Sequence, residues 1–279
     1  MKLKLMIGLQ ARMGSTRLTN KMLRPIGDDP MFHVMAKKCI DLKFLFQGEV
    51  DVSVGLCTTS KKEDDVLVEW ARYFNFDQVV RGYPLEMVDQ YLELCNGDYD
   101  YCMRICGDQP FLNLSMASDL VELMKKNMGW DYYSFCTAEG VPVMQTKIGV
   151  GTEIFSVYKL KQKVGRSEEW TEHQEHVTPI FYYQESLDNV CFLKLSPIMS
   201  KIVTAVDSRK DIKTVNKLIK HLRKRASFNF KAEQSRTRSW VSELSAIARY
   251  FADKKEIIPN NYDGRKYEWS EEWEKNQYI

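Results

Sequence analysis

Apolar and polar positions follow two rhythms along the first half of the chain. Short apolar runs at 2–9, 50–56, 78–81 and 99–105 predict buried strands. Between them, apolar residues recur every three or four positions over 31–46, 60–74, 84–95 and 114–128, which predicts amphipathic helices. Strands that alternate with helices in this way are typical of a mainly parallel sheet that is covered on both faces.

The rhythm becomes less regular after Trp130. We expect strands at 131–135, 148–155, 190–195 and 202–206 and helices at 157–164 and 173–183, as a substrate-covering insertion before the sheet is completed. Ser60 with Glu63, and Ser208 with Asp211, have the form of capping boxes, and the second predicts a helix over 209–225. The chain then becomes charged and aromatic, with a helix expected at 239–252, so we place a main domain at 1–225 and an extension at 226–279.

Composition narrows the class of protein. With 279 residues, of which 44% are hydrophobic, the chain is long enough to bury a sizeable core, and a formal net charge of +2 gives no general attraction to nucleic acid or membrane. Seven cysteines without a CxxC pair or Cys/His ligand spacing favour reduced thiols in the cytoplasm over a zinc site. The N-terminus lacks the apolar core of a signal peptide, and no run is long enough to span a bilayer.

The segment QARMGSTRLTNK, which begins at Gln10, directly follows the first expected strand. Loops at the carboxyl ends of strands in open α/β sheets are where ligands bind, and small residues let backbone N–H groups approach phosphate oxygens. The segment combines a small turn with three cations, namely Gly14 and Ser15 with Arg12, Arg17 and Lys21. This combination predicts a triphosphate site, with a solvated basic loop as the alternative; the GxxxxGK[ST] pattern is absent.

Two carboxylates occupy similar positions later in the chain. Asp108, in the segment RICGDQP, follows one expected strand, and Asp207, in VDSRKD, follows another. Carboxylates are the protein ligands that Mg²⁺ prefers, with waters and nucleotide phosphates completing its shell. The alternative for each is a structural role, as a turn cap for Asp108 and as a helix cap for Asp207.

These three segments resemble the SpsF-like cytidylyltransferases, which are related to the CMP-Kdo and CMP-acylneuraminate synthetases. The family patterns QARxGSTRLPGKxL, RITGDCP and VDTPEDL match the segments that contain Lys21, Asp108 and Asp207. The resemblance covers about residues 3–223. It implies a Rossmann-like three-layer α/β nucleotidyltransferase fold, with a mainly parallel mixed sheet and a small substrate-covering insertion.

The resemblance also implies roles for individual residues. Arg12, Lys21, Asp108 and Asp207 would be catalytic, and the two aspartates would hold one Mg²⁺. The segment VVRG and the following helix, similar to the family's VFRG and DVLDRY, would border the nucleotide. The full nucleotide set implied is Leu9, Gln10, Ala11, Arg12, Gly14, Ser15, Arg17, Lys21, Arg81, Gly82, Asp89 and Arg104, with the backbone of 9–11 beside the cytosine.

Two departures from the family pattern concern the loop and the acceptor. Thr19 and Asn20 replace the family's Pro-Gly, which should alter loop stiffness more than charge. The stretch 145–155 replaces YPDGLDVEVF and loses two aspartates, so the acceptor can differ from the usual sugars. The segment EHQEHVTP resembles DREHVTPY. It makes Glu175 and His176 candidates for the acceptor pocket or for a dimer contact, with a structural role as the alternative for His176. The charge of Lys147 would favour an anionic group, so the expected acceptor set is Lys147, Glu153, Glu175 and His176.

Together these features predict a cytidylyltransferase. The expected reaction is in-line attack of an acceptor oxygen on the α-phosphate of CTP, with release of pyrophosphate. The acceptor would be small and acidic, either a sugar acid or a phosphate or phosphonate metabolite, used for surface polysaccharide or glycoconjugate synthesis. Relatives suggest a homodimer. The alternatives are another nucleoside triphosphate, a catalytically silent nucleotide-binding protein, and a nucleic-acid patch in the basic part of the extension, which its acidic end disfavours.

Overall fold

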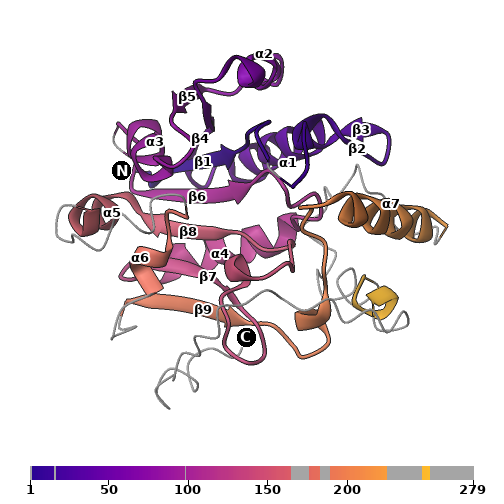
Figure 1. The fold of residues 1–279 in the computed structure, drawn as a ribbon. Helices are drawn as coiled ribbons and strands as arrows, with labels where there is room; N and C mark the ends of the chain where they lie inside the picture. Colours follow the sequence, from indigo (N-terminus) through magenta and orange to yellow (C-terminus); the bar gives the residue numbers. More distant parts are fainter. Residues whose placement is uncertain are drawn as a thin grey trace.

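A computed structural model describes residues 2–15, 17–97, 99–164, 176–182, 189–224 and 247–251. A seven-stranded sheet crosses this part of the chain in the order β5-β4-β1-β6-β8-β7-β9 (Figure 1). Only β8 runs antiparallel to its neighbours, so the sheet is mixed and mainly parallel, as predicted. The strands are β1 (Lys4–Gln10), β4 (Asp51–Thr59), β5 (Gln78–Gly82), β6 (Tyr101–Cys106), β7 (Tyr132–Cys136), β8 (Glu153–Ser156) and β9 (Val190–Lys194), with a separate ribbon of β2 (Pro25–Ile26) and β3 (Asp29–Pro30).

Helices cover both faces of the sheet. Successive side chains of a strand point to opposite faces, and Leu5, Ile7 and Leu9 of β1 enter one apolar cluster while Met6 enters another. Helices α1 (Met31–Phe46), α2 (Asp65–Tyr73), α4 (Leu114–Lys126) and α7 (Arg209–Arg223) pack in the first cluster, and α3 (Met87–Leu94), α5 (Val157–Val164) and α6 (Pro179–Tyr182) in the second. The three-layer arrangement is the predicted one.

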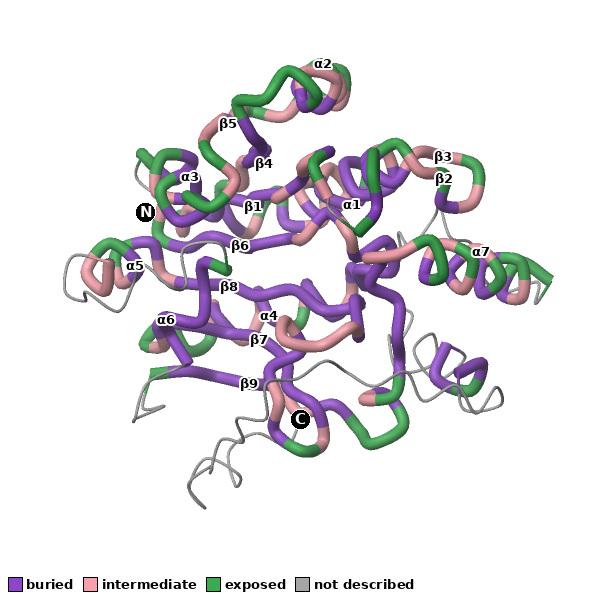
Figure 2. The backbone as a smooth tube through the Cα atoms, in the orientation of Figure 1, coloured by how far each residue is buried: buried purple, intermediate pink, exposed green. Residues whose placement is uncertain are grey.

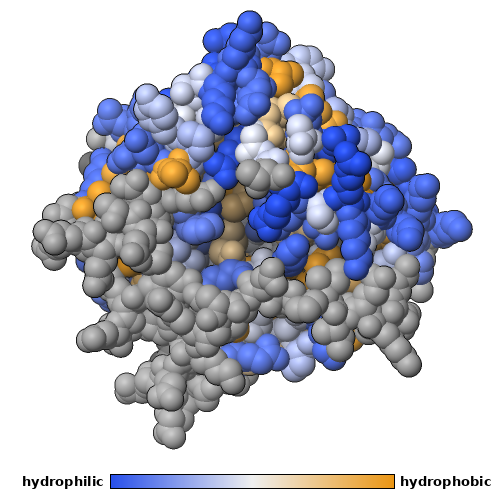
Figure 3. All heavy atoms as spheres, in the orientation of Figure 1, coloured by the Kyte–Doolittle hydropathy of each residue, from blue (hydrophilic) through white to orange (hydrophobic). Residues whose placement is uncertain are grey.

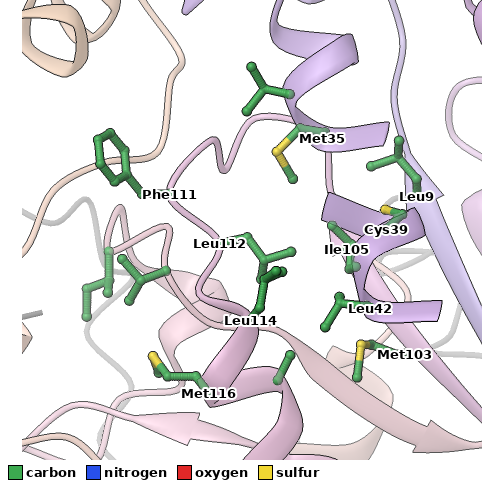
Figure 4. Packing of buried hydrophobic residues seen from close by; sticks show 14 of the residues in the cluster. Leu9, Met35, Cys39, Leu42, Met103, Ile105, Phe111, Leu112, Leu114 and Met116 are labelled. Atoms are coloured by element: carbon green, nitrogen blue, oxygen red, sulfur yellow. The ribbon is translucent and has the colours of Figure 1, made fainter. Parts of the chain in front are cut away.

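The packing of α1 shows how local periodicity builds the core. Met35, Cys39 and Leu42 lie on one face of this helix and point toward Leu9 of β1 and Ile105 of β6 (Figure 4). All five side chains are fully buried, and the central strands are buried along most of their length (Figure 2). Burying an aliphatic side chain of this size stabilises a fold by about 1.5–3 kcal/mol.

The order of the strands determines where a ligand can enter. From β1 the chain moves through α1 to β4 and then to β5 on one side, and β6 lies on the other side of β1. In open α/β sheets, ligands bind beyond the carboxyl ends of the strands where the order reverses in this way. That point lies at Gln10 and Cys106, the last residues of β1 and β6, which are paired in the sheet.

Most elements agree with the sequence prediction, and the bounds of α1 and α5 are those expected. The strand expected at 148–155 is shorter, because only 153–156 pairs with its neighbours. The expected helices at 173–183 and 239–252 lie partly outside the described residues; within these, Pro179–Tyr182 and 247–251 are helical. No helix in the described part of the chain is long and apolar enough to cross a membrane.

The capping box predicted at Ser60 is wrong. The backbone N–H of Ser60 donates to Gly82 O (3.0 Å) and so extends the pairing of β4 with β5. The helical region begins later, with a 3-10 turn (Lys62–Asp64) followed by α2, and no side chain caps either start. The sequence pattern failed here because the sheet already uses the backbone of Ser60.

The strand predicted at 202–206 is also wrong, although the segment is buried as expected. The N–H groups of Thr204 and Ala205 both donate to the carbonyl of Lys147 (3.0 and 3.1 Å), and the N–H of Val206 donates to Asp108 O (2.9 Å). In a sheet, the N–H groups of one strand donate to different carbonyls of its neighbour, so two successive donors on one carbonyl are not strand pairing. The segment instead joins the insertion to the turn after β6.

Candidate active site

The loop after β1 is held by backbone and side-chain contacts from neighbouring segments. The N–H of Ala11 donates to Cys57 O (3.1 Å), which continues the pairing of β1 with β4. The N–H of Met13 then donates to the buried carboxylate of Asp64 (2.6 Å). A Cβ added at Gly14 would lie 2.8 Å from Oε1 of Glu63, the end of a flexible side chain that can shift to make room.

The loop ends in a left-handed residue. Asn20 has φ 54° and ψ 40°, a conformation that glycine adopts freely and asparagine tolerates better than most residues. It stands where the family pattern has glycine, so the substitution preserves this turn. A short 3-10 helix (Lys21–Leu23) follows directly and directs Lys21 inward.

Lys21 lies where three segments meet. Its Nζ donates to Asp108 Oδ2 (3.0 Å), to Asp207 Oδ1 (3.2 Å) and to the carbonyl of Val206 (3.0 Å). Asp108 lies in the turn after β6, and Asp207 directly precedes the N-cap of α7. The loop cation and the two distant carboxylates that the sequence singled out therefore lie together.

The charges at this point reinforce one another. Burial alone would lower the pKa of Lys21, but the carboxylates of Asp108 and Asp207 outweigh it and raise the pKa. Burial would likewise raise the pKa of Asp207, yet Lys21, together with Arg17 and Lys147, lowers it. Nη2 of Arg17 and Nζ of Lys147 lie 3.6 and 3.7 Å from the Asp207 carboxylate. Both members of the Lys21–Asp207 pair are thus charged at neutral pH.

A second buried ion pair lies beside β1. Nη1 of Arg104 donates to Glu153 Oε1 (2.6 Å), and Nε and Nη2 donate to Oε1 of Gln10 (3.0 and 2.8 Å). Although burial opposes the charged form, the neighbouring Cys106 and Glu153 raise the pKa of Arg104 still further. Burial also raises the pKa of the Cys106 thiol, to about 12, so this cysteine is not a thiolate.

These groups surround a cavity of about 850 Å³, a size suited to a nucleotide with an acceptor beside it. Its lining carries six cations and three carboxylates, which favours anionic ligands. The face drawn in Figure 3 is hollowed near its centre, with hydrophilic residues gathered around the hollow. The charged lining consists of Arg12, Arg17, Lys21, Lys61, Arg104 and Lys147 with Glu63, Asp108 and Asp207.

Comparison with known proteins assigns the family. The family model described as cytidylyltransferase matches residues 6–239. The chain belongs to the cytidylyltransferase family. Members of this family are nucleotidyltransferases, so the protein is an enzyme of that class.

Several relatives support the assignment. The spore coat polysaccharide biosynthesis protein SpsF of Bacillus subtilis is 26% identical over 67% of this chain and 73% of its own length. An uncharacterized protein of Methanocaldococcus jannaschii is 29% identical over 76% of this chain and 82% of its own. A cytidylyltransferase of Leptospira borgpetersenii has the same fold, with a TM-score of 0.71 and 24% identity over 95% of this chain and all of its own.

The donor set of this cytidylyltransferase fits a hard divalent cation. Asp108 and Asp207 are partly exposed, at 31% and 19% of their side-chain surface, and both line the cavity. Within the described ranges, no group of three or more His, Cys, Asp or Glu side chains could hold a metal ion. Beside nucleotides, Mg²⁺ is typically bound by one or two carboxylates, and water and phosphate oxygens fill its remaining coordination positions.

The structure brings most of the expected site residues to this cavity. Those that line it are Gln10, Ala11, Arg12, Gly14, Ser15, Arg17, Lys21, Arg104, Asp108, Lys147, His176 and Asp207. Leu9 is buried in the core beside them, where its backbone belongs to β1. Glu175 lies outside the described residues. For these residues the binding roles stay predictions.

Besides Leu9, four expected site residues are absent from the described lining of the cavity, namely Arg81, Gly82, Asp89 and Glu153. The Arg81 guanidinium donates to Thr59 O (2.9 Å) and Lys61 O (2.8 Å) and lies 2.7 Å from Asp65. Glu153 is fully buried, and its carboxylate is taken by Arg104 and by the hydroxyl of Tyr132. The local sequence pattern could not reveal these contacts, because they involve residues far away in the chain.

Sequence reasoning also missed parts of the lining. Thr59 is the last residue of β4 and Lys61 lies two residues after it, and Gln109 lies next to Asp108 in a motif that had been recognised. Applying the rule of strand carboxyl ends to β4 as well would have found the first two. Thr178 lies in the recognised segment EHQEHVTP but was not singled out there, and Tyr182 of α6 carried no signal in the sequence.

Proposed function

We propose that this cytidylyltransferase transfers CMP from CTP to a small acidic acceptor, with release of pyrophosphate, in the synthesis of a surface polysaccharide or glycoconjugate. The observation that carries the proposal is the convergence of Lys21, Asp108 and Asp207 in a cation-lined cavity. The name of the SpsF relative, a spore coat polysaccharide biosynthesis protein, supports this pathway.

The cations of the loop provide the triphosphate site. Arg12, Arg17 and Lys21 line one side of the cavity, where they can bind phosphate oxygens and stabilise the charge that develops on the leaving pyrophosphate. Because its pKa is raised, Lys21 keeps its proton and its charge throughout. Fixed cations that are already in place need little reorganisation during the reaction, which is the source of their effect on the rate.

Asp108 and Asp207 would hold Mg²⁺, which when bound neutralises negative charge on the phosphates. Burial opposes the charged form of Asp207, but Lys21, Arg17 and Lys147 outweigh it and lower its pKa, so this carboxylate is ionised at neutral pH. Loss of a group that stabilises charge in this way reduces turnover by roughly 10²–10⁴.

The acceptor would lie on the side of the cavity formed by 144–147. Nζ of Lys147 lines the cavity and lies 3.7 Å from the carboxylates of both Asp207 and Asp211. A cation there favours an acceptor that carries a carboxylate, phosphate or phosphonate group. The homodimer and the cytoplasmic location stay predictions.

The direct test is pyrophosphate release from CTP with a panel of acidic sugars, polyol phosphates and phosphonates, run with Mg²⁺ and again with a chelator. We expect turnover that requires the metal and one acceptor class, and the same panel with UTP, GTP and dTTP should give much less product. CTP binding without turnover on any acceptor would favour a silent nucleotide-binding protein.

Asp108→Asn tests the metal assignment. It should lower turnover roughly 10²–10⁴-fold, because the amide does not replace a metal-binding carboxylate. Asp51→Asn, at the exposed start of β4, is the matched control and should leave turnover unchanged. An Asp108→Asn enzyme with full turnover would contradict the assignment.

A further inference from the structure

The side chain of Gln10 has a fixed orientation at the edge of the cavity. Two nitrogens of Arg104, Nε and Nη2, lie 3.0 and 2.8 Å from the same Gln10 atom. A guanidinium has only donors, so the amide atom that faces it must be the oxygen, Oε1. The amide nitrogen Nε2 therefore points away from Arg104, and Gln10 lines the cavity.

Arg104 is itself held in place. Its third nitrogen, Nη1, donates to Glu153 Oε1 (2.6 Å), and the hydroxyl of Tyr132 donates to the other carboxylate oxygen. Arg104 is paired with Glu153 across the antiparallel strands β6 and β8, and their side chains are only 6% and 0% exposed. A buried, fully hydrogen-bonded ion pair of this kind cannot reorient without leaving a charge unpaired. The row Tyr132–Glu153–Arg104 thus fixes the amide of Gln10.

The amide nitrogen remains available to a ligand. None of the described residues accepts a hydrogen bond from Gln10 Nε2, whereas Oε1 accepts two. A group that can only donate recognises an acceptor and rejects another donor. The end of β1 therefore presents a donor of fixed position to the nucleotide.

We propose that Gln10 Nε2 reads the base of the nucleotide and selects cytosine over uracil, with Arg104 and Glu153 as positioning residues. The inference rests on the proposed function and on the expectation, implied by the family resemblance, that the cytosine lies beside residues 9–11 at the end of β1. Ring atom N3 of cytosine is an acceptor, whereas N3 of uracil carries a hydrogen. An amide N–H that bonds to cytosine N3 would face another N–H in uracil, which should cost about 10- to 100-fold in affinity.

Gln10→Glu replaces this hydrogen-bond donor by an acceptor and leaves the other residues of the site unchanged. One carboxylate oxygen can still accept from Arg104, and the other replaces the N–H₂ group by an acceptor. The added charge repels every nucleoside triphosphate alike, so it cancels in the ratio of two affinities. The ratio of CTP to UTP affinity therefore reports only how well the site distinguishes cytosine from uracil.

The experiment measures CTP and UTP binding to the wild-type enzyme and to Gln10→Glu by isothermal titration calorimetry, without an acceptor. We expect the wild type to prefer CTP, and the variant to lose at least about 10-fold of that preference or to reverse it. Thermal melting checks that the variant folds. If it does not fold, Gln10→Met, which has neither donor nor acceptor, should bring the ratio toward one.

The outcomes separate this inference from the proposed function. A variant that keeps the wild-type ratio overturns the role of Gln10, while the CTP-dependent transfer stands. A shifted ratio without pyrophosphate release on any acceptor supports the role of Gln10 and contradicts the transfer. A wild type that binds the two nucleotides equally also overturns the role of Gln10, while pyrophosphate release still decides the transfer.

Discussion

At the scale of single residues, one ammonium group organises the site. Lys21 bonds to both carboxylates that the sequence marked as metal ligands, and its side chain is only 11% exposed. The arrangement keeps two like charges close together in a partly buried place, where they would otherwise repel each other. The pair should therefore contribute to stability as well as to function.

The Lys21–Asp207 pair predicts a pH dependence. The pKa of Asp207 is lowered from 3.8, so its contribution is present above pH 3.8 and is lost as the pH falls through the lowered pKa. The pKa of Lys21 is raised from 10.5, so its contribution is present below pH 10.5 and is lost as the pH rises through the raised pKa. The pair is thus fully stabilising only between these limits.

Lys21→Met should therefore lower the free energy of unfolding by about 2 kcal/mol at pH 7, and this difference from wild type should shrink below pH 3.8. Urea unfolding followed by circular dichroism at several pH values measures it. Lys43→Met, which breaks a more exposed pair with Asp77, should cost less than about 1 kcal/mol. A difference that stays constant down to pH 3 would contradict the assignment.

At the scale of elements, a buried carboxylate joins the loop after β1 to β4 and α2. Asp64, the N-cap of α2, is fully buried and accepts hydrogen bonds from the N–H of Met13 (2.6 Å) and from the N–H and hydroxyl of Thr59. The sequence pattern assigned this helix start to Ser60 and Glu63. The structure shows instead that the start of α2 anchors the loop after β1.

Asp64→Ala should lower the free energy of unfolding by about 3 kcal/mol, because it leaves the buried N–H groups of Met13 and Thr59 without an acceptor. It should also raise the KM for the nucleotide more than it lowers kcat, since the loop loses its anchor. Asp65→Ala is the matched control: Asp65 is half-exposed and, among the described residues, pairs only with Arg81, so its loss should cost less than about 1 kcal/mol. Equal effects of the two substitutions would exclude the anchoring role.

At the scale of the whole molecule, part of the C-terminal region completes the core. Ile247, Ala248, Tyr250 and Phe251 are buried in the same cluster as the apolar face of α7, and the rings of Tyr250 and His221 lie 5.2 Å apart. The family match also continues past the expected boundary at 225, to residue 239. The described part of the extension therefore contributes apolar surface to the main core.

Truncation after residue 224 should lower the free energy of unfolding by about 3 kcal/mol or more, because it uncovers the apolar face of α7. A chain that ends at 254 keeps these contacts and serves as the matched control. Thermal melting and urea unfolding of both forms measure the difference. Equal stability of the two forms would show that residues 247–251 add nothing to the core.

The sequence alone determined the succession of elements and the residues that carry the chemistry. Helical spacing predicted the bounds of α1, and the capping box of Ser208 and Asp211 is present as expected, with both of its hydrogen bonds. These features depend on residues only a few positions apart, so the local sequence pattern is enough to predict them. The cationic loop and the two aspartates were visible because strand ends in parallel sheets share one edge.

Only the tertiary structure decided which partner satisfies each polar group. Glu153 was expected to meet the acceptor and instead holds Arg104, the N–H of Ser60 belongs to a sheet, and 202–206 bonds to an insertion and a turn. A buried polar group must find a partner wherever the fold provides one. That partner lies far away in the chain, so neither periodicity nor local motifs could name it.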